Sequence, residues 1–300
     1  MMERARLYLS DVFDALARRG LLAWLPDVPF LMVQYFLHLG RLLNLKHPRL
    51  YNEKLQWIKL YDRKPEYPRY VDKLAVRDYV KEKVGEKYLI PLLATAESAE
   101  DIDWNALPER FVVKCTHGSS SNIICRDKSV LDTCEATEKL RNWMKRSWYP
   151  LSREWPYLGI APRIIVEEFL GDAEGKVPYD YKILCFGGEP KYIIVDAERY
   201  TGHRRNFYDT QWNRQDMFNR HPPYEGTVEK PKCLLEMLDV ARKLSEGIPH
   251  IRVDLYVVDD RVYFGEMTFF HGFGMEVFRP RAFEEHLGDL IRLPERTGSI

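Results

Sequence analysis

Short apolar runs of β type recur in adjacent pairs along this chain, and a loop or turn joins each pair. The pairs are FVVKC with NIICR (residues 111–126), YKILCF with KYIIVD (residues 181–196), and IRVDLYVV with VYFGEMTF (residues 251–269). Strands that follow one another through short connections pair as antiparallel hairpins. Helical patterns stand before and between these pairs. The order predicts an α+β fold with antiparallel sheets and argues against a doubly wound parallel sheet.

The helical patterns have recognisable ends. Residues 72–85 predict a helix with Asp72 as its N-cap, an apolar face, and Gly85 at its end. A second helix begins after Asp132, and a third carries an apolar stripe over residues 234–244. The run RIIVEEFL (residues 163–170) predicts a fully buried strand that ends in two carboxylates.

The overall charge narrows the class of partner. Lys and Arg number 45, and Asp and Glu also number 45, so the net charge is zero. Nucleic-acid-binding domains carry a clear basic excess, so this balance argues against nucleic acid as a partner.

The five cysteines form no CxxC pair, which argues against a disulfide framework and a thiolate zinc site. The expected location is the cytoplasm.

The most apolar stretch, residues 21–43, is interrupted by Pro26, Asp27 and Pro29, and the uninterrupted part, residues 30–39, is too short to span a membrane. Acidic and basic residues mix over the first 19 residues, so no secretory signal is expected. Two interpretations of the stretch remain open. It is either a helix buried in the fold or a surface that attaches to a membrane or a protein partner. The second interpretation would place the protein at the inner face of the membrane.

The last strand pair carries acidic residues where a simple core would be apolar. Arg252 and Asp254 share one face of the first strand, and Glu266 and Thr268 end the second. A plain two-residue turn pairs position 254 with position 265. A three-residue turn or a β-bulge instead pairs Asp254 directly with Glu266, and this is the pairing we expect.

Two carboxylates that face each other across a strand pair repel unless a cation neutralises them. Oxygen ligands from Asp254, Glu266 and Thr268 suit Mg²⁺. Alternatively, Arg252 pairs with both acids as a surface network. The sequence leaves both interpretations open.

A polar loop and a second pair of acids complete the pattern. Lys114 ends a strand and is followed by THGSSS, whose amides and hydroxyls suit a phosphate, although an ordinary hairpin loop has the same composition. Glu167 and Glu168 end the buried strand. A basic loop, a strand ending in acids, and a hairpin with paired carboxylates, in that order, are expected of a nucleotide held between two sheets.

Several motifs together resemble those of the TupA-like ATP-grasp family, named for teichuronopeptide synthesis. They are YNEKLQWIKLYDR, VDKLAVRDYVKEKVGEKYLIPLL, LPERFVVKCTHGSSSNIIC, RIIVEEFL, DYKILCFGGEPKYI, RRNFYD, ARKLSEG and IRVDLYVVDDRVYFGEMTF. The resemblance covers about residues 42–294 and implies an ATP-grasp fold, in which two α+β lobes clamp ATP and Mg²⁺. It divides the chain into an N-terminal helical segment (residues 1–70), a part with the phosphate loop (residues 71–162), and a part with the adenine strand and magnesium hairpin (residues 163–300).

The resemblance also implies roles for individual residues. Phosphate contacts are implied for Lys73, Arg77 and Lys114, and for the loop residues His117, Gly118, Ser119, Ser120 and Ser121. The strand end Glu167, Glu168, Phe169 and Leu170 would meet adenine, and Asp180 with Lys182 would reach the ribose or the phosphates. Asp254, Glu266 and Thr268 would hold Mg²⁺, and Arg252 and Lys182 would be catalytic, at the transferred phosphoryl group.

The acceptor side carries a weaker signal. The segment ERYTGHRRNFYD (residues 198–209) predicts either a solvated basic turn or a cationic loop that binds a carboxylate or a sugar phosphate. The candidate substrate residues in it are Arg199, His203, Arg205 and Asn206. Further along, HGFGME (residues 271–276) places two glycines beside the metal strand, where a turn could admit a second substrate.

Three functions are compatible with these features. The resemblance favours an ATP-dependent carboxylate–amine ligase that acts on a cell-surface polysaccharide or its precursor through an acyl phosphate, with a small molecule or a glycan as substrate. The second is a kinase that phosphorylates a hydroxyl of a glycan or small molecule. The third is a non-catalytic nucleotide-binding component of a polysaccharide-synthesis complex. Paired acids beside Arg252 argue against the third, since a scaffold has no need of them.

Overall fold

The computed structural model describes residues 2–171, 177–197 and 202–296. Five helices come first: α1 (Met2–Arg18), α2 (Asp27–Leu39), α3 (Tyr51–Tyr61), α4 (Tyr67–Val71) and α5 (Val76–Lys83). They are followed by β1 (Leu92–Ala96), β2 (Phe111–Cys115), β3 (Asn122–Cys125), α6 (Thr133–Met144), α7 (Tyr149–Ser152) and β4 (Ile164–Glu168). The last elements are β5 (Asp180–Phe186), β6 (Glu189–Ala197), β7 (Arg204–Asp209), α8 (Leu234–Ser245), β8 (His250–Val258), β9 (Arg261–Thr268) and α9 (Arg281–Leu290).

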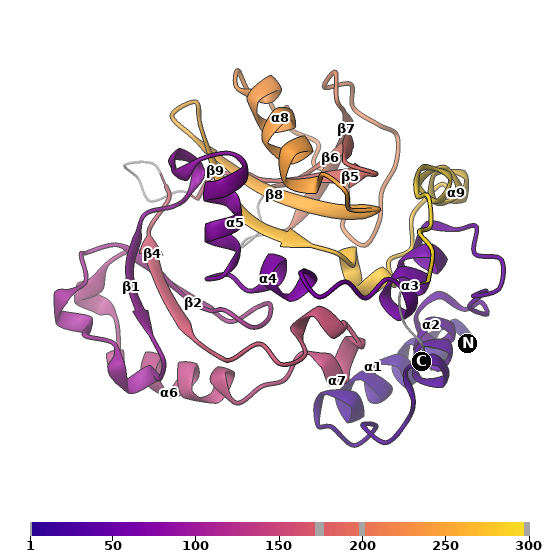
Figure 1. Cartoon of the computed structure of the whole chain (residues 1–300), viewed down its shortest axis with the longest axis horizontal. Coiled ribbons are helices and arrows are strands. Elements are labelled where there is room, and N and C mark those ends of the chain that lie inside the picture. The colour runs from indigo at the N-terminus through magenta and orange to yellow at the C-terminus, as the bar shows by residue number, and fades with distance from the viewer. Residues whose placement is uncertain (1, 172–176, 198–201, 297–300) are drawn as a thin grey trace.

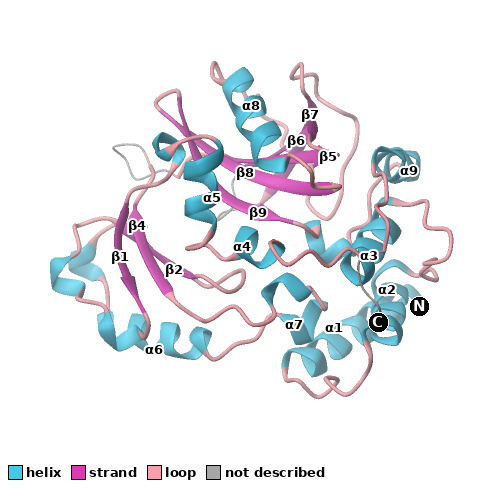
Figure 2. Ribbon diagram, viewed as in Figure 1, coloured by secondary structure: helices cyan, strands magenta, loops and turns pink. Residues whose placement is uncertain are grey.

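The strands form two antiparallel sheets, as the succession of hairpins predicted. The small sheet has the order β1-β4-β2-β3, and the large sheet has the order β7-β6-β5-β8-β9. Helix α8 covers the outer face of the large sheet, and α6 lies below the small sheet (Figure 1). Helices α4 and α5 lie between the two sheets (Figure 2). The predicted α+β class with antiparallel sheets is confirmed.

The predicted division of the chain at residue 163 falls just before β4 and stays a prediction. Strand β4 pairs with β1 and β2 and is the second strand of the small sheet. In the N-terminal segment, Tyr51 and Leu55 of α3 belong to the same core cluster as Ile183 of the large sheet. A short apolar run shows that a strand exists, but its partners are set by contacts distant in sequence.

The predicted helix ends are partly right. The helix expected from Asp72 starts four residues later, because the Asp72 carboxylate accepts hydrogen bonds from the backbone N–H groups of Leu74 and Ala75 and so caps a turn before α5. The helix ends at Lys83, close to the expected stop at Gly85. Asp132 accepts a hydrogen bond from the N–H of Glu135 and is the predicted N-cap of α6.

Helix α2 carries the most apolar stretch of the sequence, and it is only half-buried. Phe30, Leu31 and Tyr35 are fully buried, whereas Met32 and Phe36 are exposed. The buried-helix interpretation is therefore right for one face of α2. No helix within the described residues is long and apolar enough to cross a membrane.

Candidate active site

Strands β8 and β9 place the two predicted acids directly opposite each other. Asp254 pairs with Glu266, and the register shifts between Asp254 and Leu255, which leaves Gly265 as an extra residue in β9. The turn itself has two residues, since Val258 pairs with Arg261. A Cβ at Gly265 would lie 2.9 Å from the Tyr256 ring, so glycine suits the bulge. The predicted direct pairing through a bulge is confirmed.

The guanidinium of Arg252 lies among three oxygen ligands. Its Nη2 is 2.7 Å from Asp254 Oδ2, 3.2 Å from Glu266 Oε1 and 3.1 Å from Thr268 Oγ1. Its Nε is 2.6 Å from Asp254 Oδ1. Arg252 and Asp254 are 8% and 2% exposed, so the predicted pairing of Arg252 with both acids exists, but as a buried network and not a surface one. Burial alone would lower the pKa of Arg252, but the two carboxylates raise it, and the side chain stays charged.

These three oxygens converge on one position, that of Arg252 Nη2, which shows that they can surround a single cation. Two carboxylates and a hydroxyl are also ligands that Mg²⁺ accepts, together with phosphate oxygens of a substrate. Within the described residues, no group of three or more His, Cys, Asp or Glu side chains could hold a metal. The residues fit Mg²⁺ by their chemistry, provided that a nucleotide supplies further oxygens and Arg252 gives up part of its contact.

Lys182 on β5 is surrounded by carboxylates. Its Nζ hydrogen-bonds to Asp180 and lies 3.4 Å from Asp254 Oδ2 and 3.4 Å from Asp196 Oδ2. Burial alone would lower the pKa of Lys182, but the three carboxylates outweigh it and raise the pKa. Lys182 is therefore protonated at neutral pH and serves as a fixed cation, not as a proton acceptor.

Three residues that the sequence did not single out extend this network. Asp196 Oδ1 lies 2.5 Å from Arg205 Nε, and Glu276 Oε2 lies 3.0 Å from His271 Nε2. His271 Nδ1 in turn lies 2.8 Å from Arg252 Nη1. The contacts close a ring of three carboxylates and four basic side chains, in which His271 and Arg252 are the two basic neighbours: Asp254, Lys182, Asp196, Arg205, Glu276, His271 and Arg252.

A sequence signal for these residues exists, but it is weak. Asp196 ends an apolar strand and pairs in register with Asp180, which repeats the like-charge arrangement of Asp254 and Glu266. His271 and Glu276 lie in the HGFGME segment, for which the sequence predicted only a turn because of its two glycines.

The predicted phosphate-binding cations meet on the small sheet. Lys114 Nζ on β2 is 2.6 Å from Glu167 Oε2 on β4, and Arg77 Nη1 on α5 is 2.8 Å from Glu167 Oε1. Lys73 Nζ donates a hydrogen bond to the carbonyl of Gly118 and lies 3.9 Å from Glu266 Oε2. Lys73 therefore links the loop after β2 to the paired acids of the large sheet.

A narrow hollow separates these cations from the large sheet. It is lined by Lys73, Arg77, Lys114, Ile165, Glu167, Phe264 and Gly265, and its volume is about 10 Å³. Pockets for small molecules have volumes of roughly 300 Å³ or more. This hollow by itself is therefore too small to hold a nucleotide.

The THGSSS segment joins β2 to β3, as the hairpin prediction required. Cys115 N–H donates to the Ser121 carbonyl, and Ser119 and Ser120 are exposed. His117 is buried, its Nδ1 has no hydrogen-bond partner within the described residues, and burial lowers its pKa. The assignment of these loop residues to phosphate stays a prediction.

The predicted adenine segment lies where the chain leaves the small sheet. Strand β4 ends at Glu168, whose N–H donates to the carbonyl of Pro91. The Arg110 guanidinium lies 5.6 Å from the centre of the Phe169 ring. Leu170 follows directly, and the role of this segment in binding adenine stays a prediction.

The expected cationic loop of residues 198–209 is in part a strand, so that expectation is wrong for residues 204–209, which form β7. Arg205 is buried and bonds Asp196 through two nitrogens, and the Asn206 amide makes hydrogen bonds with the backbone of Tyr224. His203 Nε2 lies 3.1 Å from Asp196 Oδ1. Arg199 lies outside the described residues. Alternation of charged and apolar residues here reflects a strand whose polar face is buried against other charges.

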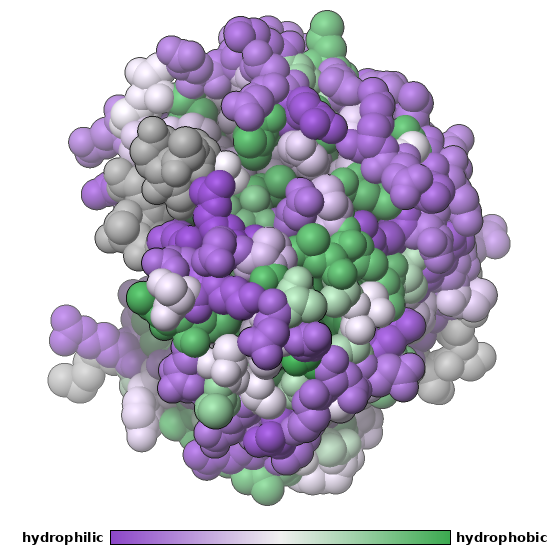
Figure 3. All heavy atoms as spheres, turned by 90° about the vertical axis from the view of Figure 1, so that its left-hand side faces the viewer, coloured by the Kyte–Doolittle hydropathy of each residue, from purple (hydrophilic) through white to green (hydrophobic). Residues whose placement is uncertain are grey.

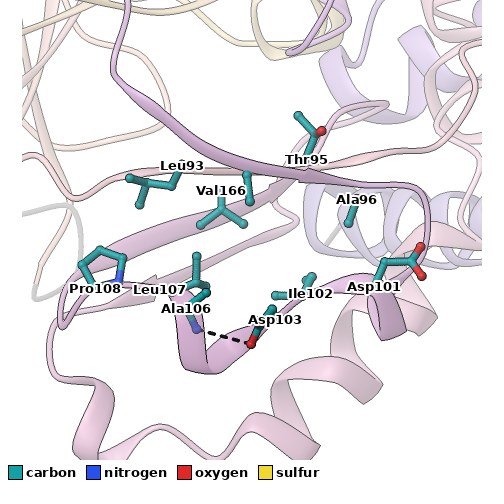
Figure 4. Close-up of a pocket in the computed structure, with 11 residues that line it drawn as sticks. Leu93, Thr95, Ala96, Asp101, Ile102, Asp103, Ala106, Leu107, Pro108 and Val166 are labelled. Atoms are coloured by element: carbon teal, nitrogen blue, oxygen red, sulfur yellow. Dashed lines mark hydrogen bonds between the residues drawn. The ribbon is translucent and has the colours of Figure 1, made fainter.

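A second cavity, of about 220 Å³, lies on the other face of the small sheet (Figure 4). Val166, Ile102 and Leu107 line it, and Val166 points away from the face that carries Glu167. The carboxylate of Asp103, which also lines the cavity, accepts hydrogen bonds from the backbone N–H groups of Asn105 and Ala106. This cavity is apolar and separate from the charged residues described above.

The sequence model of one family, TupA-like ATP-grasp, matches residues 53–292, which is most of the chain. The chain belongs to the TupA-like ATP-grasp family. The two antiparallel sheets with their facing charged residues are the ATP-grasp fold that the resemblance implied. The family and fold predictions are confirmed.

Solved ATP-grasp structures resemble this TupA-like protein at low sequence identity. D-alanine–D-alanine ligase from Bacillus anthracis complexed with ATP is 14% identical, with a TM-score of 0.41 over 72% of this chain and 55% of that one. The ATP-grasp ligase PsnB complexed with its minimal precursor is 12% identical, with a TM-score of 0.42 over 80% of this chain and 67% of that one. N5-carboxyaminoimidazole ribonucleotide synthetase from Thermus thermophilus is 12% identical, with a TM-score of 0.39 over 67% of this chain and 45% of that one.

This chain thus spans just over half the length of the D-alanine ligase. A search of curated proteins by sequence gave no match.

Proposed function

We propose that this TupA-like ATP-grasp protein is an ATP- and Mg²⁺-dependent carboxylate–amine ligase that modifies a cell-surface polysaccharide or its precursor. One observation carries the proposal: three cations line the hollow between the two sheets, here called the cleft, and Lys73 connects them to the paired acids and the two buried cations of the large sheet. The cations are Lys73, Arg77, Lys114, Lys182 and Arg252, and the acids are Asp254 and Glu266. Family membership supports the class of substrate.

The reaction would run in two balanced steps. An oxygen of the substrate carboxylate attacks the γ-phosphorus of ATP, the bond from that phosphorus to the bridging oxygen breaks, and ADP leaves. An amine nitrogen then attacks the acyl carbon and loses a proton, the amide bond forms, and inorganic phosphate leaves. Mg²⁺ held by Asp254, Glu266 and Thr268 would neutralise phosphate charge.

Arg252 and Lys182 supply the fixed charge that this chemistry needs. Both are buried and stay protonated, so they can stabilise negative charge that spreads over the transferred phosphoryl group. Glu276 and His271 act as positioning residues. Because His271 Nδ1 accepts from Arg252 Nη1, the ring proton lies on Nε2, which faces Glu276. The pair therefore fixes where the Arg252 guanidinium points.

The acceptor would bind beside β7. Arg205, His203 and Asn206 stay the proposed substrate residues, with Arg199 assigned to the same region from sequence alone. The His203 ring lies 3.7 Å from the parallel His221 ring, and His203 is oriented by Asp196. An imidazole held by a carboxylate can accept the proton that an attacking amine or hydroxyl must lose.

That same His203–Asp196 pair would serve equally in a second candidate, a kinase whose acceptor is a hydroxyl. In this case the hydroxyl oxygen attacks the γ-phosphorus, its proton passes to His203, and ADP leaves. The cleft, the cations and the acids keep the same roles. The two candidates share the release of ADP and differ in the acceptor and in the second product.

Formation of ADP by the purified protein separates these functions. ATP and Mg²⁺ are supplied with pools of uronic acids, amino acids and sugars, and the products are identified by mass spectrometry. The ligase predicts ADP only when an acid and an amine are both present, whereas the kinase predicts a phosphorylated sugar without an amine. Glu266→Gln should be inactive, and Glu135→Gln, which changes an exposed carboxylate on α6 that pairs with Lys139, should match the wild type. Absence of turnover with every pool, while ATP still binds, would refute both.

A further inference from the structure

Several polar contacts join helices α1 and α2, beside buried apolar side chains. Asp14 Oδ1 accepts a hydrogen bond from Gln34, and Asp14 Oδ2 lies 3.1 Å from His38 Nε2. Arg6 donates a hydrogen bond to the carbonyl of Leu37. Surface helices of globular proteins normally turn their apolar stripe toward the fold and their polar side chains outward. In this pair, polar groups share the inner contact with apolar groups, including one aromatic contact of Phe13 with Phe30.

A second set of apolar side chains on both helices points outward. The outward positions follow the helical repeat of three and four residues: Tyr8, Leu9 and Val12 on α1, and Met32, Val33 and Phe36 on α2. Trp24, in the connection between the helices, is 77% exposed, and Tyr8 is 69% exposed. Ten of the seventeen exposed large hydrophobic side chains within the described residues lie in the first 42 positions.

The exposed apolar side chains are concentrated at one end of the molecule. Helices α1 and α2 lie at the end of the molecule away from the small sheet (Figure 1). At the opposite end, hydrophilic side chains cover most of the surface around a central apolar patch (Figure 3). Large exposed apolar surfaces on soluble proteins mark contacts with membranes or proteins.

The charge of this segment indicates which occupant fits. Residues 2–39 contain four basic and four acidic side chains, and Arg41, Lys46 and Arg49 after α2 bring residues 1–50 to a net charge of +3. Arg4, Arg18 and Arg19 on and after α1 are exposed. Anionic lipid head groups attract such arginines, and Trp and Tyr side chains favour the boundary between head groups and acyl chains. Exposed Trp24 and Tyr8 beside arginines therefore favour a lipid surface over a protein surface.

We propose that α1 and α2 seat this protein on an anionic membrane surface. The contact is the apolar surface of α1 and α2, defined by Tyr8, Leu9, Val12, Trp24, Met32 and Phe36. Helix α2 has 13 residues, about 20 Å in length, whereas the hydrocarbon core is about 30 Å thick. The helices lie on the membrane and do not cross it. This proposal stands apart from the proposed catalytic function, because none of the six residues belongs to the cleft.

Cosedimentation with lipid vesicles tests the proposal. The full chain is mixed with vesicles of phosphatidylglycerol and phosphatidylcholine, and separately with phosphatidylcholine alone. Binding is expected to the anionic vesicles, to weaken as salt rises, and to fall about tenfold or more in Trp24→Glu and in Phe36→Glu. Both side chains are exposed, so the variants should keep the melting temperature of the wild type.

The matched control is Leu235→Glu, an exposed leucine on α8 that should bind vesicles as the wild type does. Three results would overturn the proposal. The wild type does not bind anionic vesicles, or the two variants bind as well as the wild type. The third is a dimer in solution that Trp24→Glu and Phe36→Glu dissociate, which would assign this surface to a second copy of the chain. ADP formation by unbound protein is a separate readout and reports only on the catalytic proposal.

Discussion

Replacement of Arg252 by methionine tests how the paired acids are neutralised. Arg252 is 8% exposed and makes two short contacts with Asp254, while its Nη2 also touches Glu266 and Thr268. Removing one partner from a buried ion pair costs about 3–5 kcal/mol because the other charge is left uncompensated. For a chain of this size, this corresponds to a melting temperature lower by roughly 10 °C.

Added Mg²⁺ should reverse part of this loss. In Arg252→Met, the oxygens of Asp254, Glu266 and Thr268 no longer surround a guanidinium, so a cation that binds them stabilises the folded state. We therefore expect MgCl₂ to raise the melting temperature of the variant by several degrees and that of the wild type much less. The assay is thermal unfolding followed by circular dichroism, with Arg242→Met, an exposed arginine paired with Glu189, as the control. A variant that melts with the wild type, or equal Mg²⁺ shifts in both, would refute the convergence of oxygens on one cation position.

Three further predictions follow from the buried charges and the bulge. Burial raises the pKa of Glu154 to about 7, so its stabilising contribution is present below about pH 4.5 and is lost as pH rises toward 7. Urea unfolding at several pH values should show that the free energy of unfolding of the wild type falls by about 3 kcal/mol over this range, whereas that of Glu154→Gln does not. The same pH dependence in both proteins would contradict this prediction. Glu167→Gln leaves Arg77 and Lys114 without their shared carboxylate, so the variant should unfold at a lower temperature than the wild type. Added ATP should raise the melting temperature of the variant more than that of the wild type, because the phosphates of ATP replace the lost charge. Equal ATP shifts in the two proteins would argue against phosphate binding at these cations. Gly265→Val places side-chain atoms against a neighbouring ring and should cost about 1–3 kcal/mol while abolishing ADP formation, and an active, equally stable variant would show that the bulge does not fix the acids.

The hairpins and their faces could be predicted because local pattern determines them. Alternation along IRVDLYVV and VYFGEMTF puts the charged residues on one face, and repulsion between two acids implies a neutralising cation nearby. The structure adds that this cation is Arg252 from the same strand as Asp254. The direct pairing of Asp254 with Glu266 was predicted through either a three-residue turn or a bulge, and the structure has the bulge, with Gly265 as the extra residue.

The remaining features of the fold and of the site depend on contacts between segments that are distant in sequence. No local pattern shows that β4 joins the small sheet, or that Asp196 and Glu276 close a ring with Lys182 and Arg205. Basic residues in 198–209 indicated a cationic loop, because a count of charges does not show that Arg205 points at a buried carboxylate. The outward apolar stripes of α1 and α2 escape prediction for the same reason, since periodicity gives a stripe but not the direction in which it faces.

Binding of ATP, measured by titration calorimetry with and without Mg²⁺, tests most directly whether the cleft between the two sheets is a nucleotide site. The account predicts Mg²⁺-dependent binding by the wild type and binding weaker by about tenfold or more in Lys114→Ala, which loses a charge-assisted phosphate contact. Lys139→Ala, which removes an exposed lysine on α6, should bind as the wild type does. No binding by the wild type, or equal affinity in Lys114→Ala, would contradict the account.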